Sequence, residues 1–102
     1  MQNKKIVLTI LISLLTLLIY LYSNNEKINS KAYITNQGDN TVSVVDLIKL
    51  EVIKTIKVGV APLGITILNK KNLAFIGNVG TDDIHVIDTN TDEIIRTIKL
   101  NT

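Results

Sequence analysis

The sequence of 102 residues contains no cysteine and no tryptophan, and it has only one histidine, one proline and one phenylalanine. Without cysteine, the chain cannot form a disulfide, a thiolate metal site or a cysteine nucleophile. The single histidine, His85, cannot build a multi-histidine metal site within one chain. We expect His85 to be a partly buried strand residue. Any folded domain must therefore depend on packing for its stability.

Neither positive nor negative charge is in excess beyond the first few residues. From Ser23 onward, eight lysines and one arginine are balanced by nine carboxylates, so the net charge of +2 comes from Lys4 and Lys5. Nucleic-acid recognition depends on clustered basic side chains, and we therefore expect no nucleic-acid partner. Asp82 and Asp83 are adjacent carboxylates, but the alternating pattern of a calcium loop is absent. We interpret them as turn residues, and we expect no catalytic residue, cofactor or metal.

One long apolar run is present near the N-terminus. Residues 6–22 are almost uninterrupted in their apolar character, and these seventeen residues follow two lysines. As a helix they would span about 26 Å, close to the roughly 30 Å of bilayer hydrocarbon. We predict a transmembrane signal anchor in residues 1–22 with a cytoplasmic N-terminus, because the lysines precede it. The alternative is a cleaved signal peptide and a secreted domain. Both place the remaining residues outside the cytoplasm.

Beyond a polar tether, residues 23–30, the chain alternates short β-branched runs with turn residues. No amphipathic helix is visible after Tyr22, so we predict an all-β domain over residues 31–102. The predicted strands are 31–35, 41–47, 51–58, 64–68, 72–76, 83–88 and 93–100.

These strands belong to a repeat. Residues 32–60 align on residues 74–102 without a gap, and 11 of the 29 aligned residues are identical. Asp46 and Asp88 lie at the C-terminal ends of equivalent predicted strands. We interpret them as acceptors for backbone N–H groups of the following turns. About four strands in about forty residues is typical of a β-propeller blade.

Four motifs of the chain resemble the YVTN β-propeller repeat of surface-layer and other extracytoplasmic proteins. They are Tyr33-Ile34-Thr35-Asn36, Val42-Ser43-Val44-Val45-Asp46, Val52-Ile53-Lys54-Thr55-Ile56-Lys57-Val58-Gly59 and Pro62-Leu63-Gly64. The resemblance implies that a blade begins at the Pro-x-Gly strand, beside a central channel, and ends on the rim. Residues 61–102 would then be a full blade and residues 31–60 a partial one. The fold implied is about one and three-quarter four-stranded blades.

The chain departs from that repeat at two turns. Asn69-Lys70-Lys71-Asn72 replaces the usual Pro-Asp-Gly turn, but a hairpin is still expected because asparagine tolerates the left-handed conformation. Leu47-Ile48-Lys49-Leu50 is apolar where the second repeat has Thr89-Asn90-Thr91-Asp92. This segment is either a docking patch or a drifted loop or extended strand, and the sequence leaves both open.

Propellers close with about four to eight blades, so two sheets leave large faces without neighbours. Three explanations stay open. The chain is a truncated piece of a longer product, a protomer that associates with itself or with a protein partner, or a weakly ordered sheet tethered to the membrane.

The function that we expect is a membrane-anchored, extracytoplasmic repeat protein, not an enzyme, with a structural or binding role at the cell surface. Residues 6–22 would contact the membrane, and the loops Gln37–Asn40 and Val79–Asp83 would contact a ligand or partner. The alternative is a fragment of a propeller enzyme, either lactonase-like or a quinone- or haem-dependent oxidoreductase. That alternative requires ionisable residues at the channel, and residues 64–68 contain none.

Overall fold

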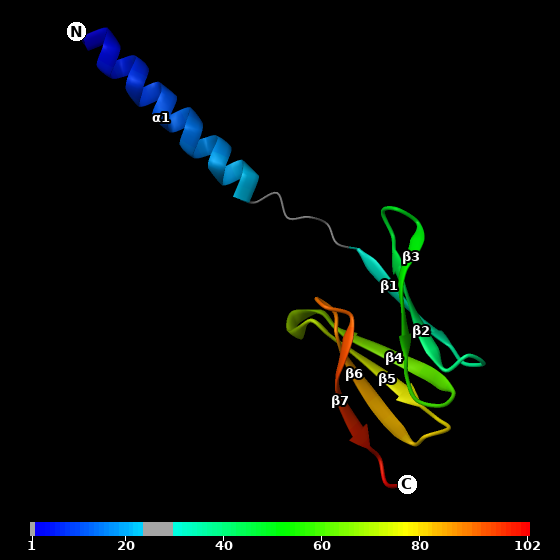
Figure 1. The fold of residues 1–102 in the computed structure, drawn as a ribbon. Coiled ribbons are helices and arrows are strands. Elements are labelled where there is room, and N and C mark those ends of the chain that lie inside the picture. The colour runs from blue at the N-terminus through cyan, green and yellow to red at the C-terminus, as the bar shows by residue number, and fades with distance from the viewer. Residues whose placement is uncertain (1, 24–29) are drawn as a thin grey trace.

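The computed structural model describes residues 2–23 and 30–102 of the chain. One apolar helix is followed by strands and a single 3-10 turn (Figure 1). The elements are α1 (Gln2–Ser23), β1 (Lys31–Asn36), β2 (Thr41–Asp46), β3 (Glu51–Lys57), β4 (Pro62–Leu68), η1 (Asn69–Lys71), β5 (Leu73–Asn78), β6 (Asp83–Asp88) and β7 (Glu93–Lys99). Residues 24–29 of the predicted tether lie outside the described residues.

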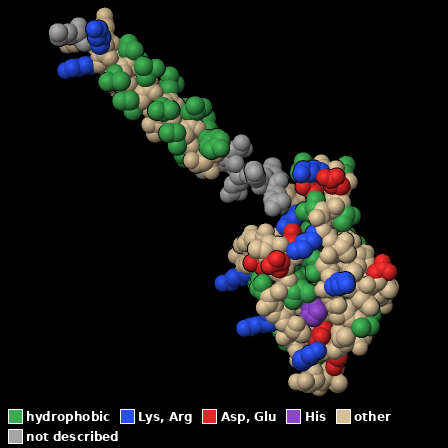
Figure 2. Space-filling view, in the orientation of Figure 1, with side chains coloured by type: hydrophobic (Ala, Val, Ile, Leu, Met, Phe, Trp, Pro, Cys, Tyr) green, Lys and Arg blue, Asp and Glu red, His purple; other side chains and the backbone are tan. Residues whose placement is uncertain are grey.

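Helix α1 is long and apolar enough to cross a membrane, as the sequence predicted. Its 22 residues correspond to about 33 Å of helix. Hydrophobic side chains lie along its surface (Figure 2), and all of its residues are exposed. The hydroxyls of Thr9, Thr16 and Ser23 donate to the carbonyl four residues earlier at 2.9, 2.8 and 2.8 Å. The helix is thus compatible with a membrane anchor or a signal sequence.

The strands form two antiparallel sheets (Figure 1). The first sheet has the order β1-β2-β3 and the second sheet has the order β4-β5-β6-β7. Each strand pairs with its neighbour in sequence, so short turns connect all strands within a sheet. The prediction of an all-β domain after the helix is confirmed, and the described residues do not close into a ring of sheets.

The sequence repeat is also a repeat of backbone geometry. Strand pairings in the first sheet recur in the second at a separation of 42 residues, and so does a β-bulge. The recurring features are Lys31↔Asp46 with Leu73↔Asp88, Asn36↔Thr41 with Asn78↔Asp83, Thr41↔Lys57 with Asp83↔Lys99, and the bulges at Val44/Val45 and Val86/Ile87. Residues 42 apart therefore occupy equivalent places in the two sheets.

The two sheets pack against each other through one apolar core. Alternate residues of a strand point to opposite faces, so each sheet buries only one face there. The first sheet contributes Val42, Val44 and Ile56, and the second contributes Ala74, Ile76 and Ile87. The faces on the far side of each sheet lie outside this core.

Several element bounds differ from the predicted ones. Strand β4 begins at Pro62, which pairs with Asn78. Proline is tolerated there because the first residue of a strand need not donate to the ladder. Asn72 adopts the left-handed conformation, with φ 55° and ψ 45°, as expected for this hairpin. Residues 47–50 form a turn, so the interpretation of that segment as an extended strand was wrong.

The connector between the sheets, residues 58–61, packs closely on the turn between β5 and β6. Gly80 N donates to Val60 O at 2.8 Å, and Val79 N donates to Ala61 O at 3.1 Å. A Cβ atom added to Gly80 would lie 2.5 Å from Val60 Cγ1. Glycine is needed here because a side chain would push the connector away.

We predict that Gly80→Ala lowers the free energy of unfolding by about 1–3 kcal/mol, since it overpacks this contact. Gly38→Ala is the matched control. Gly38 is the equivalent residue of the first sheet, and a Cβ atom there would meet nothing within 4 Å. Urea unfolding of the full chain in detergent, followed by circular dichroism, measures both variants. Equal stability of the two variants would contradict the prediction.

Candidate functional site

Polar side chains gather at the end of the second sheet where the β5–β6 turn lies. Asp83, only 3% exposed, is the centre of this cluster. Its Oδ1 accepts hydrogen bonds from Asn78 Nδ2 at 2.8 Å and from Thr81 Oγ1 at 3.0 Å. Its Oδ2 accepts one from Lys99 Nζ at 3.1 Å. Since Asn78, Asp83 and Lys99 are directly opposite one another on β5, β6 and β7, strand register brings them together.

The environment of Asp83 favours its carboxylate form. Burial by itself raises the pKa of Asp83, but the hydrogen bonds from Asn78, Lys99 and Thr81 and the nearby His85 lower it. The balance is a pKa below the usual value. Asp83 is therefore a charged, structurally engaged group at neutral pH.

His85 lies beside this carboxylate without forming a catalytic pair. Its Nε2 is 4.0 Å from Asp83 Oδ2, too long for a hydrogen bond. Its Nδ1 is buried and has no hydrogen-bond partner within the described residues. The side chain is 15% exposed, which agrees with the prediction of a partly buried histidine. In residues 2–23 and 30–102, no group of three or more His, Cys, Asp or Glu side chains could hold a metal ion.

A second polar group joins the two sheets. Lys31 Nζ on β1 lies 2.9 Å from both carboxylate oxygens of Asp92 and 2.6 Å from Thr89 O, in the turn before β7. The Lys31 and Asp92 side chains are 9% and 10% exposed. Tyr33 Oη also donates to Asp92 Oδ1. We name Lys31, Tyr33 and Asp92 the inter-sheet clamp.

The clamp keeps its tyrosine protonated. Burial raises the pKa of Tyr33, and the hydrogen bond to Asp92 and the charges of Asp92 and Asp88 raise it further. The phenol is thus a permanent donor to the carboxylate. Sequence reasoning missed this clamp, since its members are far apart along the chain. A signal was present, because the equivalent positions in the other repeat hold Leu73 and Leu50.

The two predicted contact loops lie at the same end of the two sheets, because the connector, residues 58–61, is hydrogen-bonded to both loops. Ala61 N donates to Asn40 Oδ1 at 2.9 Å, and Val60 N donates to Thr81 Oγ1 at 3.2 Å. Asn40 lies in the loop Gln37–Asn40, and Thr81 lies in the loop Val79–Asp83. Their polar groups are therefore partly used in holding the connector. The loop Val79–Asp83 is the one that also borders a hollow.

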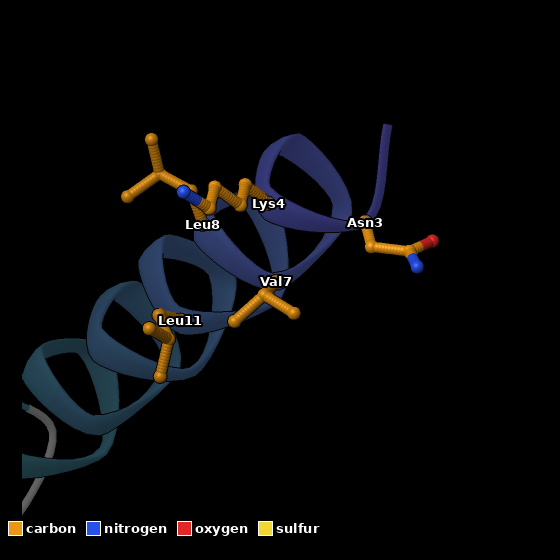
Figure 3. Close-up of a pocket in the computed structure, with 5 residues that line it drawn as sticks. All are labelled: Asn3, Lys4, Val7, Leu8 and Leu11. Carbon is orange, nitrogen blue, oxygen red and sulfur yellow. The ribbon is translucent and has the colours of Figure 1, made fainter. Parts of the chain in front are cut away.

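That hollow has a volume of about 350 Å³ and opens beside the β5–β6 turn. Residues from β4, β5, the β5–β6 turn, the start of β6 and the chain after β7 line it: Leu63, Gly64, Gly77, Asn78, Val79, Asp82, Asp83 and Leu100. Another space, of about 370 Å³, lies along α1. Figure 3 shows that all five of its lining side chains project from that one helix, so it is a groove of the helix surface and not an enclosed ligand site.

Asp46 and Asp88 have the structural role that the sequence predicted. Asp46 Oδ1 accepts hydrogen bonds from the backbone N–H groups of Ile48 and Lys49 at 2.8 and 2.9 Å. These bonds, with the Lys49 amide first, lower the pKa of Asp46. Asp88 Oδ1 accepts one from Asn90 N at 2.8 Å. Both residues stabilise turns.

Comparison with known proteins yields a similarity of fold. No protein-family model matches the chain, and no curated protein does either. Among solved structures, the chain is similar to hydrazine synthase from Kuenenia stuttgartiensis, with a TM-score of 0.66 and 25% identity. The match covers 70% of this chain and 20% of that one. Hydrazine synthase contains a β-propeller, and this chain spans about a fifth of its matched chain.

The clamp allows a test of how a buried ion pair acts between the sheets. We predict that Lys31→Leu and Asp92→Leu each lower the free energy of unfolding by about 3–5 kcal/mol, because each leaves one charge buried and unpaired. The double variant, which copies the residue types of Leu73 and Leu50, is expected to lose less than either single variant. Urea unfolding of all four chains gives the coupling. Additive losses would contradict this prediction.

Asp83→Asn tests the cluster through pH. Because the folded pKa of Asp83 is depressed, its contribution is present above the unfolded value, about 3.9, and is lost as pH falls through the folded pKa. We expect the variant to be about 1–3 kcal/mol less stable at pH 7, with the difference shrinking below about pH 4. Glu93→Gln, at an exposed carboxylate on β7, is the control. A pH-independent difference would argue against a charged Asp83.

Proposed function

We propose that the chain is a membrane-anchored, extracytoplasmic protein whose two sheets are propeller-type blades of the YVTN kind. The observation that carries the proposal is the structural repeat at 42 residues. In the second sheet, four strands follow one another from Pro62 to Lys99 in the order that a blade requires. The first sheet has the equivalents of the last three strands. The similarity of fold to a propeller-containing protein supports the same assignment.

Helix α1 supports the membrane anchor. Its side chains are almost all apolar over residues 6–22, and the hydroxyls of Thr9, Thr16 and Ser23 are bonded to carbonyls of the helix, so a lipid environment would leave these three donors satisfied. Lys4 and Lys5 favour a cytoplasmic N-terminus, and Tyr20 and Tyr22 suit the opposite membrane interface. The sheets would then lie outside the cytoplasm.

A structural or binding role is favoured over catalysis. The carboxylates Asp83 and Asp92 are held by neighbouring donors. Strand β4, which would line the channel, carries no ionisable side chain. The module would act through its loops and sheet faces, with the loop Val79–Asp83 and its adjoining hollow as the place for a small contact.

The similarity to hydrazine synthase, an enzyme by its name, favours one second candidate. In that case the chain would be part of a propeller enzyme. The catalytic groups would have to come from residues beyond the two sheets, since His85 and Asp83 do not form a hydrogen-bonded pair.

The absence of cysteine makes the topology easy to test. Single variants Asn3→Cys and Lys70→Cys place one thiol before the apolar run and one on the η1 turn. A membrane-impermeant maleimide added to intact expressing cells is expected to label only Lys70→Cys, because its turn lies outside. After permeabilisation, both variants should react.

The unsubstituted chain is the control, and it should stay unlabelled throughout. Labelling of Asn3→Cys alone in intact cells would reverse the proposed orientation. Recovery of Lys70→Cys in the medium without α1 would replace the anchor by a cleaved signal peptide and a secreted domain.

A further inference from the structure

The interface between the two sheets joins two different faces of one repeated unit. The first sheet offers the face of Val42, Val44 and Ile56, and the second offers the face of Ala74, Ile76 and Ile87. Because the repeat is 42 residues long, each of these faces has an equivalent face on the other sheet. In both sheets, the equivalent face is the one directed away from the core. The equivalent residues are Ile84, Val86 and Ile98 on the second sheet, and Ala32, Ile34 and Val45 on the first.

All six equivalents are apolar, so both halves of the observed interface exist a second time. We name Ile84, Val86 and Ile98 the outer face of the second sheet, and Ala32, Ile34 and Val45 the outer face of the first. Neither face is part of the core between the sheets. Val86 is already buried, but Ile98 is 38% exposed and Ile34 is 50% exposed. A sheet that covered these outer faces could pack on them in the same arrangement that the first and second sheets adopt against each other.

The inter-sheet clamp gives a more specific sign. Lys31 and Asp92 meet at the edge of the observed interface. Their equivalents are Leu73 on the second sheet and Leu50 on the first. If two chains met through their outer faces, Leu73 of one would thus face Leu50 of the next. A charged pair within the chain is matched by an apolar pair at the equivalent place between chains.

The other clamp contacts change in the same sense. Tyr33, which bonds to Asp92, has the equivalent Phe75, and Thr89, whose carbonyl Lys31 binds, has the equivalent Leu47. The equivalent positions therefore lack the tyrosine hydroxyl and the lysine ammonium group, and they also lack the carboxylate to which both of these donors bind. Random drift of one loop would not alter the facing strand, whereas a contact between copies requires both sides to change.

Leu50 itself is poorly placed for an isolated chain. It is 80% exposed and adopts a positive φ of 57°, a conformation that disfavours a bulky side chain. Its equivalent, Asp92, has the same conformation, with φ 58°, and uses its side chain in the clamp. Within one chain, the described contacts of Leu50 do not bury its side chain.

We propose that a second copy of this chain docks on the open sheets, with the outer face of the second sheet of one copy against the outer face of the first sheet of the next. Leu73 and Phe75 would cover Leu47 and Leu50 in each contact. The interface is heterologous, so copies add head to tail and form a closed ring when the rotation between them closes, as it does between the blades of a propeller. With about four to eight blades per ring, about two to four copies would be needed. This inference rests on the proposed propeller architecture but not on the membrane orientation.

Two substitutions that each copy the other repeat test this interface. Leu50→Asp installs the residue type of Asp92, and Leu73→Lys installs the residue type of Lys31, so both backbones already accept the new side chains. In detergent micelles, the full unsubstituted chain is expected to sediment as an oligomer of about two to four copies. Each variant should associate about a hundredfold more weakly, because it would bury one unpaired charge. Circular dichroism checks that each variant folds.

An equimolar mixture of the two variants makes the test specific. In a mixed oligomer, the lysine introduced by Leu73→Lys in one chain would meet the aspartate introduced by Leu50→Asp in the other. In the alternate contact, the unchanged Leu73 would meet the unchanged Leu50. In a ring of two or four copies the two variants alternate and both contacts are complementary, so we expect the mixture to recover association close to that of the unsubstituted chain. In a ring of three copies one contact stays mismatched, so the mixture is expected to recover association only in part. A symmetric contact of Leu50 with Leu50, or of Leu73 with Leu73, would not be restored by mixing.

Three results would overturn the inference. A monomeric unsubstituted chain would mean that further repeats or another protein cover the open faces. Unchanged association of both variants would assign the oligomer to α1. Loss without recovery in the mixture would refute the head-to-tail contact. None of these results bears on the maleimide labelling, so failure of this inference and failure of the proposed topology are distinguishable.

Discussion

In this chain, two small sheets bury apolar side chains against each other, and neither sheet has another described element over its far side. The core of Val42, Val44 and Ile56 against Ala74, Ile76 and Ile87 is therefore the contact on which the rest of the domain depends. The connector, the clamp and the polar cluster are all arranged around it. Since apolar burial is non-directional, this core sets the distance between the sheets more than it sets their orientation.

Polar contacts at the two ends of the interface supply direction. The clamp links β1 to the turn before β7, and the connector is bonded to the loops at the other side through Asn40 and Thr81. A buried ion pair such as Lys31–Asp92 gains little net free energy over an apolar pair, because both charges lose their hydration. Its geometry, however, permits one placement of the sheets. The clamp thus acts on orientation, and the core acts on stability.

Most of the architecture was predictable because it is local. Strand alternation, turn residues and the gap-free repeat determine the register within each sheet, and every predicted strand is present. The clamp was missed because Lys31 and Asp92 meet only once the sheets are stacked, although the leucines at the equivalent positions, Leu73 and Leu50, mark both residues as unusual. The start of β4 at Pro62 lies two residues before the predicted strand 64–68, because proline can begin a strand where no donation to the ladder is needed. The turn Leu47–Leu50 was ambiguous because its apolar residues fit either a strand or an exposed patch.

The same comparison between repeats distinguishes the polar groups of the two sheets. Asn78, Asp83 and Lys99 of the second sheet are bonded to one another. In the first sheet, Asn36 instead bonds to Thr41 and Ser43, and Thr41 stands where the second sheet has the Asp83 carboxylate. One set of differences between the repeats lies where one sheet meets the next, with Lys31, Tyr33 and Asp92 in place of Leu73, Phe75 and Leu50. At those places a charge on one side is paired with a charge, and a leucine on one side corresponds to a leucine on the other. At these positions, the residue type of each repeat therefore follows the contact that it makes, or lacks, with a neighbouring sheet.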